Sequence, residues 1–102
     1  MMTEDAFLKS AFDDAQPPEG LSAELSALWL ARNDRWDEAH DIAQDIDAPM
    51  GSWIHAHLHL IEGDVGNAGY WYRRAGKPAS AIGQRDAEWR AIVAAAIEGQ
   101  QG

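Results

Sequence analysis

Apolar side chains along this chain recur every three to four residues, which is the spacing of one face of an α-helix. No useful length of sequence alternates between apolar and polar residues with a period of two, so we predict no β-strands. Six segments carry the helical pattern. The predicted helices cover approximately residues 3–15, 19–32, 35–47, 52–62, 65–76 and 85–98. The pattern therefore predicts an all-α fold.

Residues at the ends of these segments fit the start and stop signals of helices. Asp34 and Asp64 are predicted N-caps, because a short side-chain oxygen can accept a hydrogen bond from a free backbone N–H group of the first turn. Gly63 suits the left-handed residue that closes a helix. Pro49 and Gly51 are interpreted as a break before the fourth helix.

Composition indicates one folded unit. The chain has 102 residues, 46% of them apolar, and its nine aromatic residues include five tryptophans, so we expect residues 1–102 to form a single domain around one core. There is no cysteine, which excludes disulfides, thiolate metal sites and cysteine nucleophiles.

The charge pattern limits the partners. The net charge is −9, and all of it arises in residues 1–50, which contain twelve acidic and three basic residues. Such an acidic surface repels phosphate backbones, so we expect no nucleic-acid partner. We see no signal peptide and no apolar run long enough to cross a bilayer, and therefore predict a cytoplasmic protein without a membrane partner.

The segment of residues 62–78, EGDVGNAGYWYRRAGKP, combines a Gly-Asp turn with small and aromatic residues at helical spacing. Ala68, Tyr72 and Ala75 fall at i, i+4 and i+7 and form one stripe. This segment resembles the second half of a tetratricopeptide (TPR) repeat or of the related Sel1-like repeat. Placing Asp34 on Asp64 aligns a second, weaker unit 30 residues earlier.

The resemblance implies antiparallel helical hairpins stacked as two degenerate TPR-like repeats, with a capping helix at each end. The longer string WDEAH…HAHLH..EGD..NA.YWYRRAG is also similar to a group of small bacterial TPR-like proteins of uncharacterised function. The first function that we predict is therefore a non-enzymatic interaction or scaffold module, which binds a protein or peptide or a second copy of the chain. The predicted binding residues lie on the first helix of each pair: Leu30, Trp53, His57 and Leu60. A terminal helix folded across this stripe is the alternative.

Histidines in the fourth predicted helix suggest a second function. His55 and His59 are one turn apart, Glu62 continues the same face, and His40 of the preceding helix could approach them. Two histidines at i and i+4 with a nearby carboxylate form a workable metal geometry, although position 56 is alanine and the HExxH arrangement is missing.

Our preferred interpretation of these histidines is a polar core that needs no cofactor. Its expected hydrogen-bond partners are Tyr70, Tyr72, Asn67 or backbone groups. The alternative is a metal or small-ligand site of His40, His55, His59 and Glu62, in either a catalytic or a non-catalytic protein. Phosphate-binding and nucleophile motifs are missing from the sequence, so we predict no catalytic residue.

Overall fold

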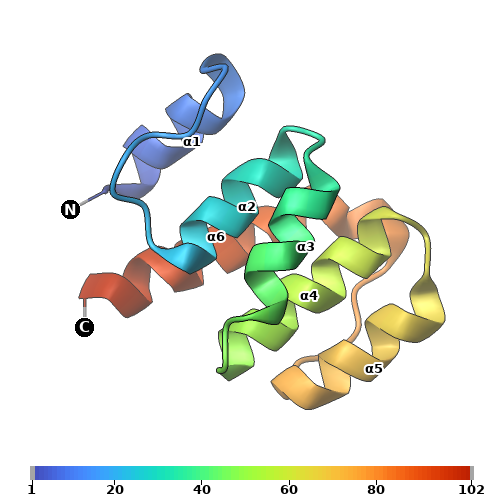
Figure 1. Cartoon of the computed structure of the whole chain (residues 1–102). Helices are drawn as coiled ribbons and strands as arrows, with labels where there is room; N and C mark the ends of the chain where they lie inside the picture. The colour runs from blue at the N-terminus through green and yellow to red at the C-terminus, as the bar shows by residue number, and fades with distance from the viewer. Residues whose placement is uncertain (1, 102) are drawn as a thin grey trace.

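The structure, a computed structural model, describes residues 2–101, and all of their regular elements are helices (Figure 1). The α-helices are α1 (Glu4–Asp13), α2 (Ala23–Arg32), α3 (Trp36–Gln44), α4 (Pro49–Ile61), α5 (Val65–Ala75) and α6 (Arg85–Gln101), and a short 3₁₀ helix, η1 (Ile82–Gln84), precedes α6. No strand occurs between residues 2 and 101, so the all-α prediction is confirmed.

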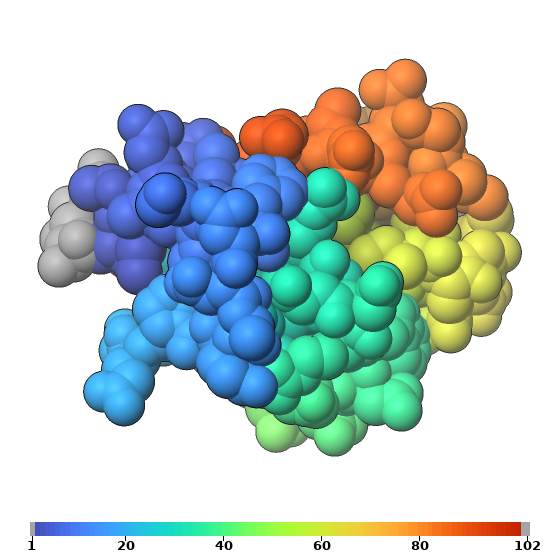
Figure 2. All heavy atoms as spheres, turned by 90° about the horizontal axis from the view of Figure 1, so that it is seen from above, coloured from blue at the N-terminus to red at the C-terminus, as the bar shows by residue number. Residues whose placement is uncertain are grey.

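Helix α4 is the element around which the others are arranged. It packs against α2, α3, α5 and α6, while α1 packs on α2 and α6 (Figure 1). Figure 2 shows α1 at one end of the molecule and the connection from α5 to α6 at the other. The side chain of Gln100 donates to the carbonyl oxygen of Met2 over 3.0 Å, so the end of α6 lies beside the start of the chain.

The main core fills the space between α1, α2, α3, α4 and α6. It includes the fully buried side chains of Phe7, Leu25, Leu28, Trp29, Ile54, Leu58, Ile92 and Val93. A smaller cluster of Ala56, Leu60, Ala68 and Tyr72 joins α4 to α5. The predicted stripe of small and aromatic residues on α5 is therefore buried, because alanines at its ends allow α4 to approach closely.

Tryptophan side chains connect neighbouring helices with hydrogen bonds as well as with apolar area. Trp29 of α2 donates to the hydroxyl oxygen of Ser10 on α1 over 3.1 Å. Trp89 of α6 donates to the Leu28 carbonyl oxygen over 2.9 Å. Trp36 of α3 donates to the carbonyl oxygen of Leu58 on α4 over 2.7 Å. A buried indole N–H needs such an acceptor, so each bond fixes the ring as well as the helix that bears it.

The start of α4 corrects the prediction at Pro49 and Gly51. These residues do not break the chain before the helix. They form its first turn, since proline at the first helical position gives up no hydrogen bond. Gly51 is required there because a Cβ atom would lie 2.3 Å from the carbonyl oxygen of Ile46.

Other predicted boundaries also shift. Asp64 caps α5 as expected, since its side chain accepts a hydrogen bond from the Asn67 amide over 3.2 Å. Asp34 does not cap α3: it has a left-handed backbone with φ of 60°, and the N-cap is Arg35, which makes no side-chain cap bond. The second helix starts at Ala23, after the cap Ser22, and the last one continues to Gln101.

Candidate functional site

Three histidine side chains from two helices converge beside α5. His55 and His59 lie on α4 and His40 lies on α3. Nε2 of His40 is 3.0 Å from Nε2 of His55, and one ring nitrogen from each of the three residues lies within 4.8 Å of the others. The structure therefore brings together the three imidazoles of the metal-site alternative. We call them the histidine cluster.

Helix geometry and a stacked tryptophan position the cluster. Residues at i and i+4 share a face of a helix, so His55 and His59 point to the same side of α4, with ring centroids 4.9 Å apart. On α3 the ring of Trp36 stacks on His40, with centroids 4.8 Å apart and planes 14° apart. Because Trp36 is hydrogen-bonded to α4, it holds His40 at a fixed distance from the other two histidines.

Trp71 of α5 covers the opposite side of the cluster. Its ring stacks on His55 with centroids 3.9 Å apart and planes 12° apart. The sequence predicted neither this contact nor Trp71 as a site residue. The available signal was its place one residue before Tyr72, beside the buried stripe of α5.

Glu62 is not part of the histidine cluster, but it orients the ring of His59. Its Oε1 atom lies 2.6 Å from Nδ1 of His59. An ionised carboxylate only accepts hydrogen bonds, so Nδ1 carries the proton and the lone pair of His59 is on Nε2. Histidine ligands of metals characteristically donate their other N–H group to such a carboxylate. Asp64, the next acid, is already engaged as the cap of α5.

Burial keeps the central histidine neutral. Removal from water, together with repulsion by the positive forms of the neighbouring His40 and His59, lowers the pKa of His55 to about 4. At pH 7 His55 is therefore an uncharged imidazole, which is the form that binds metal ions.

A cleft leads from the surface to the cluster. It has a volume of about 610 Å³ and reaches His55 and Trp71 between the α3–α4 loop and α5. Asp45 and Asp47 border it, together with Arg74. With a net charge of −9 on the chain, an acidic border raises the local concentration of cations.

The hydrogen bonds that we expected for a polar histidine core are not the ones that form. Between residues 2 and 101 no hydrogen bond joins His55 or His59 to Tyr70, Tyr72 or Asn67. Tyr70 is exposed and accepts from Arg74 over 3.3 Å. The tyrosine and Asn67 partners are therefore wrong, and Trp71 lies beside His55 instead. The burial that we expected for these histidines is confirmed, since His55 and His59 are 6% and 7% exposed.

The predicted binding stripe is not an open surface. Leu30, His57 and Leu60 are buried, with 5%, 1% and 1% of their surface exposed, and Trp53 is half-buried. Leu60 packs against the α5 stripe, and α6 covers His57. For Leu30, His57 and Leu60 the expectation of a partner-facing surface is wrong, because Leu30 lies in the main core, α6 covers His57 and α5 covers Leu60. Binding through the half-buried Trp53 stays a prediction.

Glu88 of α6 accounts for that covering and was missed by the sequence reasoning. Its buried carboxylate lies 2.7 Å from Nδ1 of His57 and accepts hydrogen bonds from Tyr72 over 2.7 Å and from Trp53 over 3.3 Å. Burial alone would raise the pKa of Glu88, but the hydrogen bonds from His57 and Tyr72 outweigh it and lower the pKa. The available signal was an acid four residues before Ile92, inside the apolar stripe of α6.

Comparison of the chain with protein-family models, with curated proteins and with solved structures finds no match. Among the helices of residues 2–101, none combines the length and the hydrophobicity that a membrane crossing requires.

Proposed function

We propose that this protein binds one divalent transition-metal ion, with zinc as the reference, through His40, His55 and His59. The observation that supports the proposal is the approach of three imidazole nitrogens to within 4.8 Å of one another. Imidazole nitrogen is a common ligand of zinc, copper and nickel, and a chain without cysteine must rely on it.

The distance between two of the three ring nitrogens is close to that in a tetrahedral zinc centre. Zinc–nitrogen bonds of about 2.0–2.1 Å place two ligands of a tetrahedron roughly 3.3 Å apart. The two Nε2 atoms of His40 and His55 are 3.0 Å apart, so they need almost no movement. The nitrogen of His59 lies within 4.8 Å of the other two and would have to move closer to complete the ligand set.

The surroundings favour a bound cation over three unliganded rings. Without an ion, the contact between His40 and His55 accommodates a single proton between two ring nitrogens. Glu62 leaves the lone pair of His59 on the nitrogen away from the carboxylate. Stacking on Trp36 restrains the ring of His40, and stacking on Trp71 restrains the ring of His55. The two side chains therefore lose less conformational entropy when an ion binds.

Three protein ligands leave one position of a tetrahedral ion for water or a small ligand. The acidic cleft that reaches His55 gives ions and small molecules a route to this position. We therefore propose a metal-binding protein whose ion keeps one coordination position accessible.

Native mass spectrometry during a zinc titration tests this function. We expect the parent protein to bind one zinc ion and the variants His40→Ala and His55→Asn to bind none. His57→Asn is the matched control, because His57 lies on α4 between two cluster residues but belongs to the buried Glu88 contact. The control should bind one ion. Absence of zinc from the parent protein, or equal binding in His55→Asn, would refute the proposal.

The relationship to TPR and Sel1-like repeats is a separate proposal about architecture. It is supported by the packing of α2 on α3 and of α4 on α5, each pair joined by a turn of three residues. It is further supported by Gly63, whose φ of 85° suits the end of the first helix of a pair. The interaction function stays a prediction, and the buried stripe gives it no binding face.

A further inference from the structure

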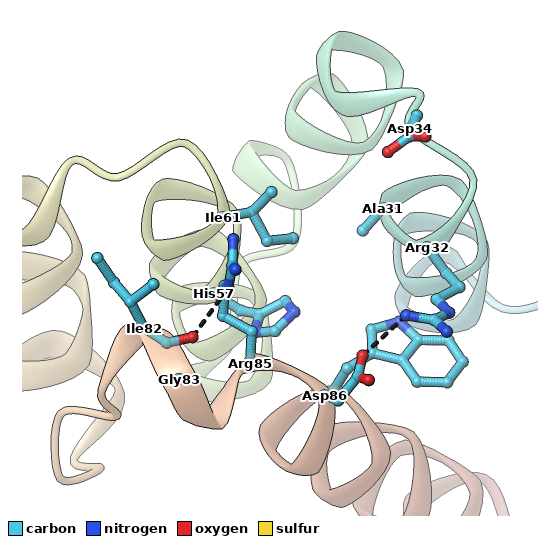
Figure 3. Close-up of a pocket in the computed structure, with 10 residues that line it drawn as sticks. Ala31, Arg32, Asp34, His57, Ile61, Ile82, Gly83, Arg85 and Asp86 are labelled. Carbon is cyan, nitrogen blue, oxygen red and sulfur yellow. Dashed lines mark hydrogen bonds and ion pairs between the residues drawn. The ribbon is translucent and has the colours of Figure 1, made fainter.

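A second cavity, drawn in Figure 3, lies beside His57 of α4. Its volume is about 360 Å³, and it is bounded by α4, the α2–α3 turn, η1 and the start of α6. Residues two apart on a helix point roughly 200° apart, so His57 faces away from His55 and His59. The apolar part of the wall consists of Ala31, Ile61, Ile82 and Trp89.

His57 presents a hydrogen-bonding atom to this cavity. Only 1% of the residue is exposed, and in Figure 3 its ring points into the cavity between Ile61 and Asp86. Nδ1 is 2.7 Å from Oε1 of Glu88, whereas Nε2 has no hydrogen-bond partner among residues 2–101. Because the Glu88 carboxylate accepts, Nδ1 carries the proton and Nε2 offers a lone pair.

The orientation of His57 is strongly determined. The same Glu88 carboxylate accepts from the hydroxyl group of Tyr72, with both carboxylate oxygens at 2.7 Å. Trp53 adds a third donor at 3.3 Å. A carboxylate held by donors from α4 and α5 cannot turn away, so His57 keeps its free acceptor toward the cavity.

The charges at the mouth of the cavity cancel. Arg32 and Arg85 line it together with Asp34 and Asp86. Arg32 and Asp86 already form an ion pair at 2.8 Å, and Arg85 donates to the carbonyl oxygen of Ile82 over 2.9 Å. A balanced mouth gives little preference to anions or cations.

We propose that this cavity binds a small uncharged molecule with an apolar body and a hydroxyl group, which donates a hydrogen bond to Nε2 of His57. An apolar cavity of about 150 Å³ accommodates benzene, so a volume of about 360 Å³ admits a substituted ring. Small-molecule sites combine apolar side chains with a few fixed polar groups. Here Ala31, Ile61, Ile82 and Trp89 supply the apolar contacts, and His57 supplies the buried acceptor beneath the charged mouth. The site is independent of the histidine cluster.

Phenol, anisole and toluene are suitable probes because they share one ring and differ in hydrogen bonding. Phenol donates, anisole only accepts, and toluene does neither. Titration of the ¹⁵N-labelled parent protein by NMR gives each affinity and reports the shift of the His57 ring nitrogens. We expect phenol to bind about five to ten times more tightly than toluene and to shift Nε2, and anisole to match toluene. Equal affinity for phenol and toluene, or no binding of any probe, would overturn the proposal.

Two histidine variants separate this site from the proposed metal site. His57→Asn keeps an amide N–H near the position of Nδ1 for Glu88 but removes the acceptor at Nε2, so the preference for phenol should disappear. His55→Asn should lose zinc and keep that preference. A phenol preference that survives in folded His57→Asn would contradict the assignment, and the Nε2 shift in the parent protein decides the question if His57→Asn does not fold.

Discussion

Nε2 of His40 lies 3.0 Å from Nε2 of His55, although 15 residues separate the two histidines in the chain and each belongs to a different helix. Two ring nitrogens at this distance share one proton or one metal ion. Trp36 on one side and Trp71 on the other hold the two rings in place.

Zinc should raise the stability of the parent protein. An ion that binds only the folded state adds about 2.7 kcal/mol to the free energy of unfolding when its free concentration is 100 times the dissociation constant. Thermal unfolding with and without zinc, followed by circular dichroism, measures the effect. His55→Asn should show no zinc-dependent rise of the midpoint, and His57→Asn should show one. A rise of equal size in His55→Asn would mean that the ion binds elsewhere.

Glu62→Gln should weaken zinc binding by about 10- to 100-fold, because a neutral amide is a poorer acceptor for the His59 N–H group and makes the imidazole less basic. The Glu62 side chain is 40% exposed, so the fold should tolerate the change. Competition with a chromophoric chelator gives the affinity. Glu98→Gln is a control on an exposed acid of α6. Equal affinities of the two variants would exclude an orienting role for Glu62.

Acid should destabilise the metal-free protein between about pH 6.5 and pH 4. The pKa of His55 is about 4 in the folded protein and 6.5 in its ordinary state, so in this interval the unfolded chain binds a proton that the folded chain does not. The contribution of neutral His55 to stability is fully present above pH 6.5 and is lost as the pH decreases toward 4. His40 and His59 lie against His55 and repel its charged form. Asp45, Asp47 and Arg74 line the same cleft at its border.

Urea unfolding at pH 7.5 and pH 5, in the presence of a chelator, measures this loss. We expect the free energy of unfolding to fall by about 2 kcal/mol from the titration of His55 alone. His55→Gln should lose less stability over the same interval. An unchanged free energy of unfolding in the parent protein would show that His55 is protonated equally in both states.

The Glu88 contact should be a major source of stability between α4, α5 and α6. Glu88→Gln replaces a charged acceptor of three donors with an amide, and we expect a loss of about 1–3 kcal/mol. Tyr72→Phe removes one of these donors and should also destabilise. Chemical unfolding of both variants and of the double variant forms a mutant cycle, in which the coupling energy should be about 0.5–3 kcal/mol. Additive effects would show that Tyr72 and Glu88 do not interact in solution.

Gly51→Ala should destabilise the first turn of α4. Its Cβ atom would lie 2.3 Å from the Ile46 carbonyl oxygen, and relief requires movement of the backbone, at a cost of about 1–3 kcal/mol. Gly66→Ala on α5 is the matched control, since a Cβ atom there meets nothing within 4 Å and alanine favours the helix by up to about 1 kcal/mol. The midpoint of thermal unfolding should fall in Gly51→Ala and rise in Gly66→Ala. Equal midpoints for the two variants would contradict the close approach at Gly51.

The helices themselves were predictable because their signals are local. Apolar spacing, the cap Asp64 and the terminating Gly63 act within a few residues of the chain, and all of them appear in the structure as expected. The fixed 3.6-residue turn also places His55 and His59 on one face of α4 without any tertiary information. The errors at Pro49 and Asp34 concern residues whose role depends on a neighbouring turn.

The composition of both sites depended on contacts between helices that are distant in the sequence. His40 and Trp71 reach His55 from α3 and α5, and Glu88 reaches His57 from α6, 31 residues later. Periodicity shows which face of a helix is apolar, but it does not show which neighbour will cover that face. The sequence therefore determined the helices, the cysteine-free composition and the paired histidines of α4. Only the tertiary structure decided that α6 buries His57 and that a third imidazole completes the cluster, because these outcomes depend on how the helices pack.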